Sequence, residues 1–146
     1  EPFQSKEELQ RYVNTGEGDI PIALDETLRE IEPDELNKYK VCAAVVLKPA
    51  LLGYANAIQF AKTALSYNMK PVISSSFESS IGTYILASIA AVIDDSIPVG
   101  LETISWFASD IIDDPLFIEN STISLDMYTS IFDKIDFSKL EEIHLG

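Results

Sequence analysis

Three short apolar runs, each ending at a polar residue, recur at nearly even spacing in the first half of the chain. They read IALDET, VVLKPALLG and VISSSFESSIG, and they reach Asp25, Lys48 and Ser74 at intervals of 23 and 26 residues. This interval suits a strand, a loop, a helix and a return, so the pattern predicts repeated βα units. Because the carboxyl ends of parallel strands converge on one site, we expect these three residues to meet at one rim.

The residues between these runs predict the remaining elements. Four strands are expected, after which the rhythm fades, and a closed barrel of this kind needs eight strands and about 250 residues. The chain therefore holds roughly the second half of a (β/α) barrel or, alternatively, an open sheet. Strands are expected at 20–24, 43–47, 71–73 and 97–101, helices at 5–14, 34–38, 55–67, 81–93 and 103–110, and a hairpin at 116–125.

Bulk properties narrow the class of protein. A chain of 146 residues is about one domain. Its mean hydropathy of +0.11 fits a parallel sheet covered on both faces. The net charge of −14 argues against nucleic acid or an anionic membrane as a partner. The single cysteine, Cys42, excludes an internal disulfide and fits a reducing cytoplasm, and its apolar neighbours indicate a buried residue rather than a nucleophile.

Five motifs resemble those of the o-succinylbenzoate synthase family, a branch of the enolase superfamily, over residues 1–105. In that family, strands end in Glu-Glu-Pro, Asp-Glu-Ser, Lys-Pro and Ser-Ser-Ser-x-Glu-Ser-Ser-x-Gly, and a Pro-Gly-Leu-Asp-Thr motif follows. The counterparts here, in order and at barrel spacing, are Glu1-Pro2, Asp25-Glu26-Thr27, Lys48-Pro49, the serine-rich segment 74–82, and PVGLET at 98–103.

The resemblance implies a fold, a cofactor and a reaction. The fold would be α/β, the C-terminal part of an enolase-superfamily TIM-like (β/α) barrel, with about four βα units in residues 1–110. Residues 111–146 would be an extension that packs on the barrel or on a capping domain outside the chain. The implied reaction is the magnesium-dependent dehydration of 2-succinyl-6-hydroxy-2,4-cyclohexadiene-1-carboxylate to o-succinylbenzoate, in menaquinone biosynthesis.

The resemblance also implies roles for particular residues. Asp25 would be one of three carboxylates that hold a Mg²⁺ ion. Lys48 would be the second of two lysines that flank the carboxylate substrate. The pocket for the succinyl carboxylate would be lined by Ser74, Gly100 and Leu101.

Parts of the family pattern do not occur in this chain. The family's Lys-x-Lys motif, which carries the proton-abstracting lysine on an earlier strand, does not occur before Asp25, and the chain opens at the second glutamate of Glu-Glu-Pro. We therefore expect Glu1 to be a neighbour of the site rather than a metal ligand. An opening without methionine favours a processed, truncated or excised chain, inactive alone. The rest of the barrel and the capping domain would come from the same or another chain.

Two other functions remain open at this point. An N-acylamino-acid racemase or dipeptide epimerase of the same superfamily would use both lysines for two-sided proton transfer, but the serine-rich run counts against it. A non-catalytic, flavodoxin-like binding module would explain the length without any missing part.

Simpler structural roles are also possible for several of these residues. Asp25 could be a helix N-cap, and Ser79 or Ser80 could cap the helix that follows them. We expect Glu78 to hydrogen-bond local backbone rather than act as a base. Trp106 and Phe107 are expected to cover the core.

Overall fold

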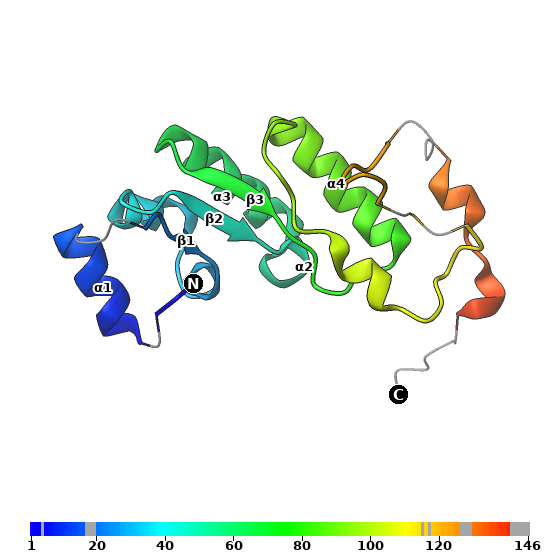
Figure 1. The fold of residues 1–146 in the computed structure, drawn as a ribbon, viewed down its shortest axis with the longest axis horizontal. Helices are drawn as coiled ribbons and strands as arrows, with labels where there is room; N and C mark the ends of the chain where they lie inside the picture. Colours follow the sequence, from blue (N-terminus) through cyan, green and yellow to red (C-terminus); the bar gives the residue numbers. More distant parts are fainter. Residues whose placement is uncertain (4, 17–19, 115, 117, 126–129, 141–146) are drawn as a thin grey trace.

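A three-stranded parallel sheet lies at the centre of the molecule (Figure 1). The computed structural model describes residues 1–3, 5–16, 20–114, 116, 118–125 and 130–140. The strands are β1 (Ala23–Leu24), β2 (Ala44–Leu47) and β3 (Lys70–Ile73), in the order β1-β2-β3. Successive side chains of a strand point to opposite faces of the sheet. In β2, Val45 and Leu47 are therefore fully buried while Val46 is only half-buried.

The buried face of the sheet is covered by the long helices that follow β2 and β3. The connection from β2 to β3 runs through α2 (Pro49–Leu52) and α3 (Tyr54–Ser66), and α3 packs on both of these strands. Its buried residues Ala57, Phe60, Ala61 and Ala64 recur at the three- and four-residue spacing of one helix face. After β3, α4 (Ser80–Asp94) packs on β3.

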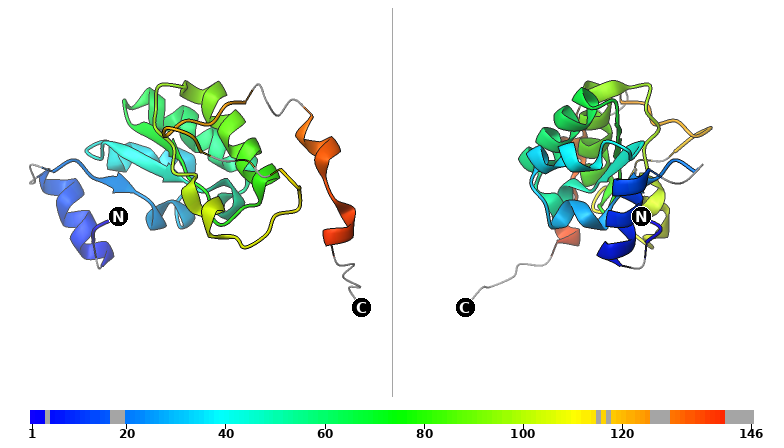
Figure 2. Two further views of the ribbon diagram at one scale, coloured as in Figure 1. Left: turned by 45° about the vertical axis from the view of Figure 1, so that its right-hand side comes forward. Right: turned by 90° about the vertical axis from the view of Figure 1, so that its left-hand side faces the viewer.

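The two ends of the chain lie apart from this centre. Helix α1 (Lys6–Thr15) has Ser5 as N-cap and stops at Gly16, whose φ of 63° is the left-handed conformation that ends many helices. Figures 1 and 2 show α1 at one end of the molecule and the C-terminal segments at the other. The 3-10 helices are η1 (Glu26–Arg29), η2 (Pro33–Tyr39), η3 (Glu102–Trp106), η5 (Ile131–Lys134) and η6 (Phe137–Lys139).

The core has two parts. The larger cluster lies between the sheet and its helices and includes Leu24, Val45, Leu47, Phe60 and Ile73. A smaller cluster joins the C-terminal segments to one side of α4, and it is built by Ile104, Ile112, Leu116 and Ile131. In addition, the main-chain N–H of Leu116 donates a 2.8 Å hydrogen bond to the buried Ser80 hydroxyl.

The predicted helices at 5–14, 55–67 and 81–93 and the first three strands are confirmed in place, and their ends shift by no more than three residues. The predicted helix at 34–38 is the 3-10 helix η2. The predicted fourth strand at 97–101 is wrong: it is reduced to one parallel bridge between Ser74 and Gly100. Pro98 has no N–H to donate to a ladder, which disfavours a longer pairing.

Further along, the expected helix at 103–110 is the shorter η3. The expected hairpin at 116–125 is a tight turn with one antiparallel bridge from Glu119 to Thr122, and residue 117 lies outside the described residues.

The fold is thus α/β with a small parallel sheet, consistent with part of a barrel. Among the described residues the sheet does not close, and its second face is only partly covered, since Val46 and Val72 are half-buried. The sequence predicted a sheet covered on both faces, whereas one face is only partly covered. The division at residue 110 stays a prediction, and residues 126–129 and 141–146 of the expected extension lie outside the described residues. No helix in the described part of the chain has the length and apolar character to cross a membrane.

Candidate functional site

Strand alternation places the three candidate residues on the same face of the sheet. Leu24, Leu47 and Ile73 are the last residues of their strands, and each is buried toward the helices. The next residues, Asp25, Lys48 and Ser74, therefore project toward the opposite, less covered face. Leu24 pairs with Val45, whereas Leu47 pairs with Ile73. Lys48 is thus level with Ser74 in the sheet. Asp25 is level with Val46, two residues before Lys48, so the two side chains lie diagonally opposite each other on neighbouring strands.

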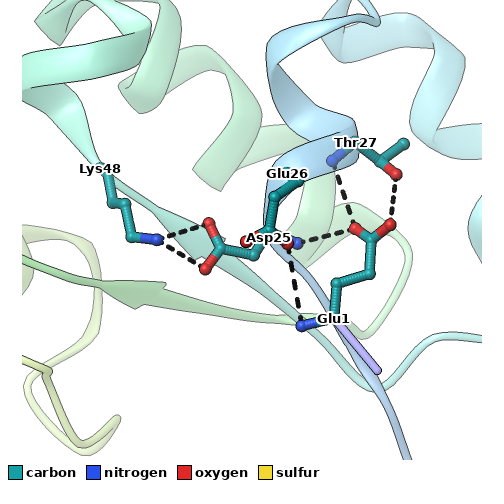
Figure 3. A network of polar contacts seen from close by, with 5 residues as sticks. All are labelled: Glu1, Asp25, Glu26, Thr27 and Lys48. Carbon is teal, nitrogen blue, oxygen red and sulfur yellow. Dashed lines mark hydrogen bonds and ion pairs between the residues drawn. The ribbon is translucent and has the colours of Figure 1, made fainter. Parts of the chain in front are cut away.

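Lys48 spans this diagonal and forms an ion pair with Asp25. Its Nζ lies 2.8 Å from Oδ1 and 2.6 Å from Oδ2 of Asp25, so both carboxylate oxygens accept from it (Figure 3). The side chains are 28% and 21% exposed. Because most of the surface of both side chains is buried, the attraction between their charges is less screened by salt than that of a fully exposed pair. The structure therefore joins two of the predicted site residues, through side chains that lie 23 positions apart in sequence.

Glu1 holds the end of β1 from the other side (Figure 3). Its Oε2 accepts hydrogen bonds from the main-chain N–H groups of Asp25 at 3.1 Å and Thr27 at 3.2 Å. Its Oε1 accepts from the Thr27 hydroxyl at 2.7 Å. Glu26 is exposed and lies 4.0 Å from the amino group of Glu1. Glu1 is therefore in contact with the main chain of Asp25, and the role of Thr27 was not foreseen, although it stands in the quoted Asp-Glu-Thr motif.

Ser74 and Gly100 form the rim beside β3. The N–H of Gly100 donates to Ile73 O at 2.9 Å, and the Ser74 hydroxyl donates to Gly100 O at 3.3 Å. Ser75 donates to the same carbonyl from both its N–H, at 2.9 Å, and its hydroxyl, at 3.1 Å. The Ser75 hydroxyl also lies 2.7 Å from Thr103 Oγ1. Ser75 and Thr103 therefore tie the two segments together, a pairing that the sequence analysis missed.

Leu101 and the Asp25–Lys48 pair border different hollows. The Leu101 side chain is 2% exposed and belongs to the core. It lines, with Gly100, a cleft of about 870 Å³ against α4. Asp25 and Lys48 line a separate hollow of about 60 Å³ with Arg29. Among the described residues, the structure brings Asp25 to Lys48 and Ser74 to Gly100, and no hydrogen bond joins the two pairs.

The loop after Ser74 is folded back on itself. The Ser76 N–H donates to Glu78 Oε2 at 2.5 Å, which agrees with the predicted local role of Glu78. Ser79 is the N-cap of α4, although its 3.5 Å bond from the Gly82 N–H is long. A side chain at Gly82 would place its Cβ 2.6 Å from the Glu78 Cβ. Glycine at this position therefore allows Glu78 to fold against the first turn of α4.

Phe77 in the same loop joins an aromatic cluster with Trp106 and Phe107 that faces solvent. Phe77 has a φ of 65°, which is uncommon for a residue other than glycine. The centroid of its ring lies 6.0 Å from that of Trp106 and 6.4 Å from that of Phe107, and both pairs are packed edge to face. Trp106 is 78% exposed, so the expectation that Trp106 and Phe107 cover the core is wrong. The short η3 turns these rings outward, whereas a longer amphipathic helix would have turned one face inward.

Cys42 is confirmed as a buried residue. It is 3% exposed, and burial, with a smaller contribution from the nearby Glu1 charge, raises the pKa of its thiol to about 11. A thiol with this pKa carries very little thiolate at neutral pH, so Cys42 is not a nucleophile.

The described residues do not by themselves fit a magnesium ion. Carboxylate oxygens are suitable ligands, but both oxygens of Asp25 already accept from Lys48. No group of three or more His, Cys, Asp or Glu side chains stands together in the part of the chain that the structure describes. Any such ion would need ligands from outside these residues.

Comparison with known proteins identifies the group to which the chain is related. No protein-family model matches it. It is 32% identical to the chloroplastic protein PHYLLO of Arabidopsis thaliana over 85% of the chain. It is 38% identical to the o-succinylbenzoate synthase of Haemophilus influenzae over 64% of the chain, and 40% identical to that of Escherichia coli over 71%.

The bacterial matches fall in the C-terminal region of those enzymes. The chain belongs to the o-succinylbenzoate synthase family of the enolase superfamily. It spans about a third of the length of these bacterial relatives, 31% and 32%, and 8% of the Arabidopsis protein.

Proposed function

We propose that this chain supplies part of the active site of an o-succinylbenzoate synthase. The enzyme would be a lyase that removes water from 2-succinyl-6-hydroxy-2,4-cyclohexadiene-1-carboxylate to give o-succinylbenzoate, in menaquinone biosynthesis. The observation that carries this proposal is the ion pair of Asp25 and Lys48, formed where the parallel strands β1 and β2 end. Two bacterial relatives with this region of sequence bear the name of that enzyme.

In this proposal Lys48 stabilises negative charge. Removal of a proton next to a carboxylate is difficult because a second negative charge then develops on the same group. An ammonium group held in a fixed, partly desolvated position stabilises that charge more than water does. Lys48 is anchored by Asp25 and is 28% exposed, so it is held in such a position. Over a ring that becomes aromatic, the same ammonium group also contributes a cation–π interaction.

The second carboxylate of the substrate would bind at the rim of β3. The Ser74 hydroxyl makes a long 3.3 Å hydrogen bond to Gly100 O, which a carboxylate acceptor would replace with a stronger one. Because the Leu101 side chain lies in the core, Leu101 would contribute through its main chain.

The remaining parts of the site belong to the proposal as well. Magnesium dependence requires carboxylates beyond Asp25, and a proton-abstracting base is also required. We propose that both come from the rest of the barrel, in the same or another chain, as does the capping domain. The cytoplasmic location predicted from Cys42 stays a prediction, and the Arabidopsis relative is chloroplastic by name.

The test is an assay of the longest natural polypeptide that contains this chain, with Lys48→Ala as the variant. Formation of o-succinylbenzoate is followed in the presence of Mg²⁺, and we expect kcat/KM to fall at least about 100-fold because one electrostatic group is lost from the site. Lys62→Ala on α3, where the lysine is exposed and lies outside the site, is the matched control and should keep the activity.

An intact protein that formed no o-succinylbenzoate would refute the proposed function, and racemisation of an N-acylamino acid would then be assayed on the same sample. If Lys48→Ala and Lys62→Ala were equally active, the role of Lys48 would be wrong.

A further inference from the structure

Glu1 is exposed as a whole residue, but its side chain is only 10% exposed. Both carboxylate oxygens of Glu1 accept hydrogen bonds from the segment at the end of β1. Such a carboxylate is held by three hydrogen bonds, two from main-chain N–H groups and one from a hydroxyl. Hydrogen bonds to an ionised acceptor are stronger than neutral ones, so they restrain the chain that donates them.

Glu1 makes a capping hydrogen bond to η1 that the N-cap residue, Asp25, would ordinarily make. Asp25 is the N-cap residue of η1, and aspartate at an N-cap commonly bonds the free N–H groups of the first turn with its own side chain. Here the Asp25 side chain makes no capping hydrogen bond. The Thr27 N–H, one of those first-turn donors, is bound by Glu1 instead. The Asp25 carboxylate is thereby left to accept from Lys48.

The main chain of Asp25 also has an unusual conformation. Its φ of −134° and ψ of −79° lie outside the common helix and strand regions. The hydrogen bonds from its own N–H and from the Thr27 N–H restrain the chain on both sides of these torsions. The direction in which the carboxylate leaves the main chain depends on them.

We propose that Glu1 is a positioning residue, which caps η1 in place of Asp25 and so directs the Asp25 carboxylate toward Lys48. This inference rests on the proposed function for its importance in catalysis, but the contacts themselves do not depend on it. Without Glu1, Asp25 turns to the Thr27 N–H and leaves Lys48. A glutamine at position 1 retains an amide oxygen for the two main-chain donors and removes the charge. Its NH2 group takes the place of Oε1 and can donate to the Thr27 hydroxyl, which then accepts instead of donating.

The experiment measures the coupling between Asp25 and Lys48 by a double-mutant cycle in urea unfolding of the chain. The cycle uses Asp25→Asn and Lys48→Met and is repeated in Glu1→Ala and Glu1→Gln backgrounds. We expect the coupling to fall by at least half with Glu1→Ala and to persist with Glu1→Gln. Thr27→Val, which removes only the hydroxyl bond, gives a milder variant if Glu1→Ala does not fold, and a smaller loss is expected there.

Glu35→Gln is the matched control, because the Glu35 carboxylate also accepts from a main-chain N–H, that of Glu32 at 3.0 Å, but on η2. It should leave the coupling unchanged. A Glu1→Ala chain that is less stable but keeps the full Asp25–Lys48 coupling would overturn the proposal, since Glu1 would then be merely structural.

The same variants separate this inference from the proposed function. In the longest natural polypeptide, Glu1→Ala should lower kcat by roughly 10- to 100-fold, the usual effect of losing a partner that orients a site residue, while Glu1→Gln retains most of the activity. Equal losses with Ala and Gln would overturn positioning in favour of a role for the charge. If the unmodified protein forms no o-succinylbenzoate, the proposed function fails, and the coupling measurement still decides the role of Glu1.

Discussion

At the scale of single residues, Lys48 shows how local chemistry sets up the site. A residue before proline is driven away from helical torsions, and Lys48 has a φ of −107° and a ψ of 88°. Pro49 in turn opens α2, where its missing N–H has no cost. The Lys-Pro pair therefore ends β2, starts a helix and leaves the lysine side chain free to cross to Asp25.

The reactivity of the Cys42 thiol tests whether this residue is buried. Because the pKa of its thiol is raised to about 11, we expect alkylation by iodoacetamide at pH 8 to be at least about 100-fold slower than in the urea-unfolded chain. The rate should rise about tenfold per pH unit until the pH approaches that pKa. Mass spectrometry of quenched samples measures both.

The sign of the stability change follows from the same shift. The folded chain holds the thiol proton more tightly than the unfolded chain, so this contribution is present below the pKa of the unfolded thiol and is lost as the pH rises through about 11. Cys42→Ala should lack this part of the loss. Rapid alkylation of the folded chain at pH 8 would contradict the burial of Cys42.

At the scale of elements, the first turn of α4 depends on the fit between Gly82 and Glu78. A Cβ at position 82 would lie 2.6 Å from Glu78 Cβ, so Gly82→Ala should destabilise the chain by about 1–3 kcal/mol through overpacking. Urea unfolding measures the change in the free energy of unfolding.

The matched control removes the obstacle. In a Glu78→Gly background the clash is absent, and alanine is a better helix former than glycine, so Gly82→Ala should be neutral or stabilising there. An equal destabilisation in both backgrounds would show that contact with Glu78 is not the reason for glycine.

At the scale of the whole molecule, the described residues offer a divalent cation too few ligands. Asp25 is paired with Lys48, and no larger acidic or histidine cluster stands among the described residues. We therefore expect millimolar MgCl₂ to raise the Tm of the chain no more than NaCl at equal ionic strength, because a ligand stabilises a protein only by binding its folded state. Differential scanning calorimetry makes this comparison.

A Tm that climbed with Mg²⁺ concentration above the NaCl control would contradict this expectation. The variant Asp25→Asn would then be measured in the same way. If Asp25 is a ligand of the ion, the rise in Tm with Mg²⁺ should be absent in this variant.

The elements that could be predicted are those with strong local signals. The Ser5 cap, the spacing of apolar residues in α3 and the run before Lys48 each predicted an observed helix or strand. The segment at 97–101 could not be assigned in this way, because strand pairing depends on neighbours that lie far away in sequence. For the same reason the outward turn of Trp106 was missed, since a short 3-10 helix has no extended periodicity to read.

By itself, the sequence determined where the strands of the sheet end and which polar residues stand there, because burial, proline and capping preferences act over a few neighbouring positions. Only the tertiary structure decided which of these residues touch. The diagonal reach of Lys48 to Asp25 follows from the strand register, and the capture of the β1 end by Glu1 joins residues 24 and 26 positions apart. The formation of such contacts depends on how the whole chain packs, which no local pattern encodes.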